Sequence, residues 1–148
     1  MNNSRIFADG KPGLFLAKGT LIPIAVVSIL TSSPCLAQIT PDTTLGNQNS
    51  RVTTGVNIQQ KEADLIEGGV QRGSNLYHSF REFNVHNGQR VYFANPTGVD
   101  NIFSRVTGSN ASNILGTLGV NGAANLFLLN PNGIIFGPNA RLDIQGSF

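Results

Sequence analysis

Cysteine is almost absent from this chain of 148 residues, and tryptophan is absent altogether. The single cysteine, Cys35, lies in a segment that we interpret below as a cleaved leader, so the rest of the chain cannot rely on disulfide bonds. Without other cysteines, the two histidines, His78 and His86, make a poor metal site. We therefore expect a domain held by apolar burial and backbone hydrogen bonds, with no cofactor.

Charged residues are also scarce, at 12% of the chain, and they balance once the leader is set aside. Three of the ten basic residues (Arg5, Lys11 and Lys18) and one of the eight acidic residues (Asp9) precede residue 38, which leaves seven of each sign. A mature chain without net charge offers no electrostatic case for binding nucleic acid or an anionic membrane.

The first 37 residues have the pattern of a secretory signal peptide. Basic residues precede the apolar stretch 21–30, and small residues precede a cleavage position between Ala37 and Gln38. These ten apolar residues fall well short of the ~20 that a membrane-spanning helix needs, which disfavours an anchor. A lipoprotein signal at Cys35 is disfavoured because Pro34 stands where a small residue is required. We expect residues 38–148 to form a secreted chain that does not span a membrane.

Short apolar segments separated by glycine, asparagine and proline turns fill this mature chain, and they predict an all-β fold. An extended polar segment is expected over residues 38–46 and a polar turn over residues 59–62. Residues 76–85 alternate imperfectly, so a short helix stays an alternative to a strand there. A weak internal echo relates residues 113–116 to residues 125–128. The predicted strands are 51–58, 63–66, 76–85, 89–94, 102–106, 112–118, 124–129, 134–136 and 141–144.

The turn Asn130-Pro131-Asn132-Gly133 lies between two continuously apolar runs, residues 126–129 and 134–136. Pro131 fixes φ at the second turn position, while Asn132 and Gly133 tolerate positive φ. Unbroken apolar runs beside such a turn favour corners of a solenoid, whose coils stack in parallel, over the hairpins of a sandwich or barrel. The sandwich stays the alternative on the pattern alone.

Two motifs resemble those of the two-partner secretion domain found in filamentous haemagglutinin-type exoproteins. Asn130, Pro131, Asn132, Gly133 and Ile134 match the family's NPNGI signature. The second signature, NPNL, is matched only in part by Asn95, Pro96, Thr97 and Gly98. The resemblance covers roughly residues 40–148 and implies a right-handed parallel β-helix with an N-terminal cap. Because the sequence stops at Phe148 without a terminating feature, we expect a domain truncated at the C-terminus, within a longer exoprotein.

The resemblance also implies a function: a non-enzymatic secretion module, recognised by an outer-membrane β-barrel translocator with POTRA domains. Such a chain crosses the periplasm of a double-membrane bacterium and folds outside, at the cell surface or free. The alternative is an adhesion or haemagglutination module that binds cell-surface glycans. A polysaccharide-cleaving β-helix enzyme is disfavoured, because the carboxylates show no recognisable spacing. The candidate carboxylates are Asp64, Glu67, Glu82, Asp100 and Asp143.

Overall fold

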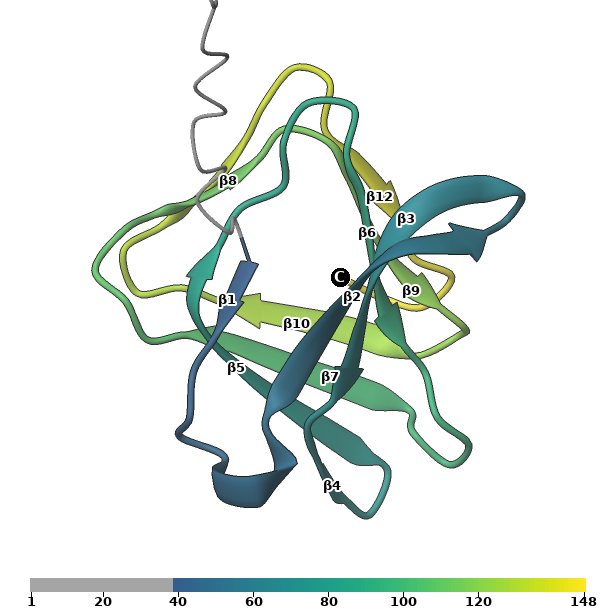
Figure 1. Cartoon of the computed structure of the whole chain (residues 1–148), viewed down its shortest axis with the longest axis vertical. Helices are drawn as coiled ribbons and strands as arrows, with labels where there is room; N and C mark the ends of the chain where they lie inside the picture. The colour runs from purple at the N-terminus through teal and green to yellow at the C-terminus, as the bar shows by residue number, and fades with distance from the viewer. Residues whose placement is uncertain (1–38) are drawn as a thin grey trace, which may run out of the picture. The chain divides into compact units, whose positions relative to one another are not determined.

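A computed structural model describes residues 39–148, which contain strands and one short 3₁₀ helix but no α-helix. The structure confirms the all-β prediction and shows a β-solenoid of about three turns (Figure 1). The elements are β1 (Ile39–Pro41), η1 (Gly46–Gln48), β2 (Ser50–Ile58), β3 (Lys61–Gly68), β4 (Val70–Arg72), β5 (Asn75–Phe83), β6 (Arg90–Ala94), β7 (Asn101–Val106), β8 (Ser112–Ile114), β9 (Thr117–Asn121), β10 (Asn125–Leu129), β11 (Ile134–Phe136) and β12 (Arg141–Asp143).

Three successive coils stack in parallel register. The first coil runs through β5, an isolated bridge at Val85 and β6; the second through β7, β8 and β9; the third through β10, β11 and β12. Figure 1 shows β5, β7 and β10 side by side along one face, with β6, β9 and β12 along another.

Antiparallel strands extend two of these faces at the N-terminal end. The β2–β3 hairpin joins the second face through the parallel pairing of β3 with β6. Both β1 and β4 pair antiparallel with β5. The hairpin turn consists of Gln59 and Gln60 alone, with φ of 53° and 64°, the positive values that a two-residue hairpin turn of the primed type requires. These strands are the expected N-terminal cap.

Side chains that point into the coils form columns across successive strands. Leu76, Ile102 and Leu126 stand in register and are 3%, 0% and 0% exposed. Near the cap the phenylalanine rings of Phe80 and Phe83 pack edge to face, with centroids 5.2 Å apart. Full burial of each such side chain stabilises the folded state by about 1.5–3 kcal/mol relative to leaving it exposed. Stacked apolar columns therefore replace the disulfides that the chain lacks.

Three local predictions were wrong. Residues 112–118 form two strands, because the chain turns at Gly116, where any Cβ would clash with the carbonyl oxygens of His86 and Gln89. The polar turn ends at Gln60, so residues 61 and 62 belong to β3. The extended segment expected over residues 38–46 contains β1, and residues 76–83 form the predicted strand, so the alternative of a short helix is excluded. The proposed internal similarity is also incorrect, because residue 113 lies in β8 and residue 125 lies in β10, which belongs to a different face of the solenoid.

Candidate functional site

The Asn130-Pro131-Asn132-Gly133 motif forms the corner between β10 and β11 in the third coil. The N–H of Gly133 donates to the carbonyl oxygen of Asn130 at 3.0 Å, which closes a four-residue β-turn. The N–H of Asn132 donates to Oδ1 of Asn130 at 2.9 Å, so the asparagine side chain supports the same turn. Gly133 has φ of 103°, a conformation that side-chain-bearing residues rarely adopt. The expected turn chemistry is thus present.

The same two asparagines reach across to the second coil. Nδ2 of Asn130 donates to the carbonyl oxygen of Asn110 at 3.0 Å and to Oγ of Ser112 at 2.9 Å. Nδ2 of Asn132 donates to the carbonyl oxygen of Gly108 at 2.8 Å. All three acceptors belong to the corner between β7 and β8, or to the first residue of β8. The motif therefore ties the corner of one coil to the corner of the coil before it.

Asn95, Pro96, Thr97 and Gly98 form a different corner, which leaves β6 and leads into the second coil. Nδ2 of Asn95 donates to the carbonyl oxygen of Val99 at 2.8 Å, and Oδ1 of Asn95 accepts from the N–H of Ala124 at 3.0 Å. Asn95 thus makes a turn-closing bond and an inter-coil bond, as Asn130 does. The other three residues of this motif are exposed.

The two Asn-Pro motifs do not form one site. The amide of Asn95 bonds to residues 99 and 124, whereas the amides of Asn130 and Asn132 bond to residues 108–112, so they share no partner. Ile134 continues the second motif as the first residue of β11, half-buried and in register with Ser112. The predicted cleavage position, Ala37 and Gln38, lies outside the described residues.

A buried carboxylate that the sequence analysis did not single out joins the cap to the coils. Oδ2 of Asp42 accepts from the hydroxyls of Ser79 and Thr107, both at 2.7 Å. Oδ1 accepts from the hydroxyl and the N–H of Thr44, at 2.7 and 3.0 Å. Burial raises the pKa of Asp42, but the bonds from Ser79, Thr44 and Thr107 outweigh it and hold this pKa at about 2. No motif in the sequence marks this residue.

His78 lies beneath the cap and is 2% exposed. Its Nδ1 lies 2.9 Å from Oγ of Ser50, and the same Oγ accepts from the N–H of Ser79 at 3.3 Å. Either the hydroxyl of Ser50 donates to Nδ1 or Nδ1–H donates to this hydroxyl, depending on the tautomer of His78. Burial lowers the pKa of His78 to about 4, so the ring is neutral at pH 7.

An asparagine ladder runs along the outside of the β5–β7–β10 face. Nδ2 of Asn101 donates to Oδ1 of Asn75 at 3.0 Å, and Nδ2 of Asn125 donates to Oδ1 of Asn101 at 2.9 Å. The N–H of Ser147 donates to Oδ1 of Asn125 at 2.8 Å. Spacings of 26 and 24 residues between the asparagines are the signal in the sequence that could have revealed the coil length.

Four of the five carboxylates considered as catalytic candidates accept hydrogen bonds from other side chains. Asp64 accepts from Nε2 of Gln89 at 2.6 Å, Glu67 from the hydroxyl of Thr53 at 2.9 Å, and Asp143 from the hydroxyl of Tyr92 at 2.6 Å. Glu82 accepts from Nδ2 of Asn110 at 2.9 Å. Within residues 39–148, no group of three or more histidine, cysteine, aspartate or glutamate residues could hold a metal ion. The same part of the chain has no helix long and apolar enough to span a membrane.

Comparison of the sequence with known proteins identifies its family. The profile of the TPS secretion domain matches residues 37–148. A heme/hemopexin-binding protein of Haemophilus influenzae is 29% identical over 124 residues, which cover 83% of this chain and 13% of that protein. A protein of the same name from the Rd strain is 36% identical over 69 residues, 47% of this chain and 7% of that protein.

The chain therefore spans only a small part of the length of these relatives. Comparison with solved structures gave no significant match. The family match covers the whole described solenoid, including both Asn-Pro corners and the cap. The chain belongs to the TPS secretion domain family, and residues 37–148 form the secretion module of a two-partner secretion exoprotein.

Proposed function

We propose that a signal peptide, residues 1–37, is removed between Ala37 and Gln38, and that the rest passes unfolded through the periplasm to a dedicated outer-membrane β-barrel translocator. The family match over residues 37–148 is the observation that carries this proposal. Exoproteins of this family are secreted by Gram-negative bacteria, which supports a final location outside the cell. The absence of cysteine after Cys35 suits a chain that must stay unfolded during passage.

Folding outside the cell supplies the direction of transport. The three coils bury an apolar core that extends from the cap to the third coil, from Ile39 to Leu126. The apolar side chains of an unfolded chain in the periplasm are still exposed to water. Burying them on folding releases roughly 25 cal/mol of free energy per Å² of apolar surface. A chain that folds on emergence cannot slide back through the translocator, so export proceeds without ATP.

POTRA domains of the translocator are the proposed first contact. Their sheets can accept an added strand from an extended peptide, and residues 76–85 form such a segment while the chain is unfolded. In the folded solenoid the same residues lie in β5 and its continuation to Val85, paired on one side with β7 and on the other with β1 and β4. Folding would therefore remove this segment from the partner and release the chain.

The two Asn-Pro motifs have one role that the geometry supports directly and one that we propose. In the folded chain, Asn95, Asn130 and Asn132 bond to neighbouring coils. These bonds require at least two adjacent coils, so they are absent during passage and the amides are free. We assign recognition by the translocator to the unfolded motifs, Asn95 to Gly98 and Asn130 to Ile134, and inter-coil bonding to the folded ones.

Co-expression with the cognate translocator tests this assignment. The full chain, its Asn130→Ala variant and its Asn139→Ala variant are compared in the culture medium, and the folding stability of each purified chain is measured by urea unfolding. Asn139 is a matched control, since its Nδ2 makes one corner bond, to Oδ1 of Asn87 at 3.3 Å. We expect Asn130→Ala to reduce secretion by more than its loss of stability explains, and Asn139→Ala to be secreted normally.

Two results would contradict the assignment. Normal secretion of Asn130→Ala would leave the motif with its structural role alone. Retention of all three chains in the cell, with or without the translocator, would contradict the secretion proposal itself.

We also propose that the exoprotein acts by binding and not by catalysis. The two relatives are named for binding heme and hemopexin, and four of the five candidate carboxylates of this module accept structural hydrogen bonds. Adhesion to cell-surface glycans is the second binding role that the exoprotein family suggests. Binding by the secreted chain, without turnover of polysaccharide substrates, is the expected result of a direct assay.

A further inference from the structure

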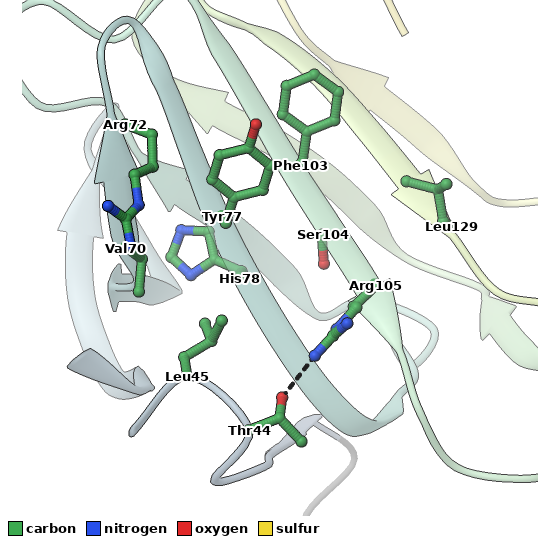
Figure 2. Close-up of a pocket in the computed structure, with 10 residues that line it drawn as sticks. All are labelled: Thr44, Leu45, Val70, Arg72, Tyr77, His78, Phe103, Ser104, Arg105 and Leu129. Atoms are coloured by element: carbon green, nitrogen blue, oxygen red, sulfur yellow. Dashed lines mark hydrogen bonds between the residues drawn. The ribbon is translucent and has the colours of Figure 1, made fainter. Parts of the chain in front are cut away.

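A pocket of about 660 Å³ lies over the outer face of β5 and β7, next to the loop that follows β1 (Figure 2). Its apolar walls come from Leu45, Val70, Tyr77, Phe103 and Leu129. Tyr77 is 37% exposed and Leu129 is 53% exposed, although both belong to strands whose opposite face is core. Neither the family match nor the names of the relatives assign a role to this pocket.

Two aromatic rings of the pocket wall, Tyr77 and Phe103, belong to a column of three stacked rings. Tyr77, Phe103 and Phe127 stand in register on the outer face of β5, β7 and β10. The first two ring centroids are 5.3 Å apart with planes at 16°, and the next two are 4.7 Å apart with planes at 10°. Phe103 has a ring stacked on each face, so it presents its edge to the pocket, and one face of Tyr77 is covered by Phe103. Sugars stack on ring faces, whereas positive ring edges attract the face of another aromatic ring.

Two arginines also line the pocket, and no acidic residue does. The side chain of Arg72 makes no hydrogen bond or ion pair within residues 39–148. Arg105 donates from Nε to Oγ of Ser79 at 3.1 Å and from a terminal nitrogen to Oγ1 of Thr44 at 2.9 Å, the bond drawn in Figure 2. Ser79 and Thr44 in turn donate to the carboxylate of Asp42, which partly offsets the charge of Arg105. One positive charge, on Arg72, is left uncompensated.

Two unpaired buried polar atoms lie on the core side of the strands that carry this pocket. His78 and Ser104 line the pocket and are 2% and 0% exposed. Nε2 of His78 and Oγ of Ser104 have no hydrogen-bond partner among the described residues. Buried polar atoms are rarely left unpaired in folded proteins. Because His78 and Ser104 alternate with the outward Tyr77 and Phe103 along β5 and β7, their side chains point into the core and are not ligand contacts of this pocket.

From these features we infer that the pocket binds a small planar aromatic carboxylate. The aromatic face of this ligand lies against the ring edges of Tyr77 and Phe103, between the side chains of Leu45, Val70 and Leu129. Its carboxylate pairs with the guanidinium of Arg72. This activity is independent of secretion, and its test needs no translocator.

The test uses 1-pyrenebutyrate, a planar aromatic ring system with one carboxylate, and the full chain purified from its producing cells. Binding is followed by fluorescence anisotropy. We expect saturable binding of one probe per chain, and Arg72→Gln is expected to weaken it about tenfold, because a charge-assisted pair is lost. Arg141→Gln is the matched control: Arg141 is an exposed strand arginine that lies outside this pocket, and its variant should bind within about twofold of the unchanged chain.

A second pair of variants tests the apolar wall. Leu129→Asp places a negative charge beside the probe and should weaken binding at least about tenfold, while Leu142→Asp, on β12, should change it by less than about twofold. Both leucines are largely exposed, at 53% and 45%, so neither change removes core packing. Circular dichroism confirms that each variant is folded before binding is compared.

Two neutral or flexible probes identify the chemistry of the ligand. The alcohol 1-pyrenebutanol should bind about tenfold more weakly than the acid and should not respond to Arg72→Gln. Palmitate, a flexible carboxylate, should bind more weakly than 1-pyrenebutyrate. The inference is overturned if no probe binds saturably, if Arg72→Gln and Arg141→Gln weaken binding equally, or if palmitate binds as tightly as the aromatic acid.

Discussion

At the scale of single residues, His78 makes the stability of the module depend on pH. The neutral ring is buried, and burial lowers its pKa from 6.5 to about 4. Between these two values the unfolded chain binds a proton that the folded chain does not bind, so the free energy of unfolding falls as the pH falls from 6.5 to 4. The difference of pKa corresponds to about 3 kcal/mol.

Urea unfolding at several pH values measures this loss. We expect the unchanged chain to lose about 3 kcal/mol of unfolding free energy between pH 7 and pH 4. His78→Leu should lose much less over the same range, since leucine cannot titrate. His86→Leu is the control, because His86 is exposed, and it should keep the pH dependence of the unchanged chain. An equal pH dependence in His78→Leu would contradict the assignment.

Two buried serines offer a contrast at the same scale. Ser79 and Ser104 are both 0% exposed. Oγ of Ser79 donates to Asp42 and accepts from Arg105, whereas Oγ of Ser104 has no partner among residues 39–148. Removing a partner from a buried carboxylate costs about 1–3 kcal/mol, while removing an unpaired hydroxyl costs little or is favourable.

We therefore expect Ser79→Ala to lower the free energy of unfolding by about 1–3 kcal/mol and Ser104→Ala to leave it within about 1 kcal/mol of the unchanged value, or to raise it. Thermal unfolding of the two variants at pH 7 gives the comparison. A larger loss in Ser104→Ala than in Ser79→Ala would show that the hydrogen-bond pattern beneath the cap is wrong.

At the scale of elements, the asparagine ladder fixes the register between coils. Asn101 is its central member and bonds to Asn75 on one side and Asn125 on the other. Asn101→Ala removes both side-chain bonds and should lower the free energy of unfolding by about 1–3 kcal/mol. Asn139→Ala should change it by less than about 0.5 kcal/mol, as exposed substitutions usually do. Equal effects of the two variants, measured by urea unfolding, would show that the ladder does not hold the coils.

The sequence predicted most strands and the solenoid class, because unbroken apolar runs between glycine and asparagine turns are a local signal. It did not predict which strands stack on which. The echo between residues 113–116 and 125–128 compared apolar content, whereas the true equivalence of Asn75, Asn101 and Asn125 depends on inter-coil bonds. β1 was missed because its residues gain strand structure only by pairing with β5.

The Asn-Pro corners were predicted as turns, and their turn-closing bonds could be anticipated from residue types alone. Their inter-coil bonds could not, since the acceptors of Asn130 lie 18 and 20 residues away in sequence. The Asp42 network was missed for the same reason: it joins residues 42, 79 and 107, which only the stacked coils bring together. The sequence therefore predicts hydrogen bonds within a turn, but it does not predict which residues of different coils come into contact.

At the scale of the whole molecule, the structure and the family match give one account of a secreted solenoid. The apolar core is continuous from the cap through three coils, without disulfides. Such a chain can remain unfolded until it leaves the cell and then fold as a unit, since each coil contacts its neighbours in parallel register. The order of these events, passage first and folding second, is the central claim.

The most direct test of this claim is the amount of full chain that reaches the medium with and without the cognate translocator, combined with limited proteolysis of the released protein. We expect release only when the translocator is present, and a protease-resistant core close to residues 39–148 in the released chain. Release without the translocator, or a protease-resistant chain that accumulates inside the cell while the translocator is active, would contradict the account.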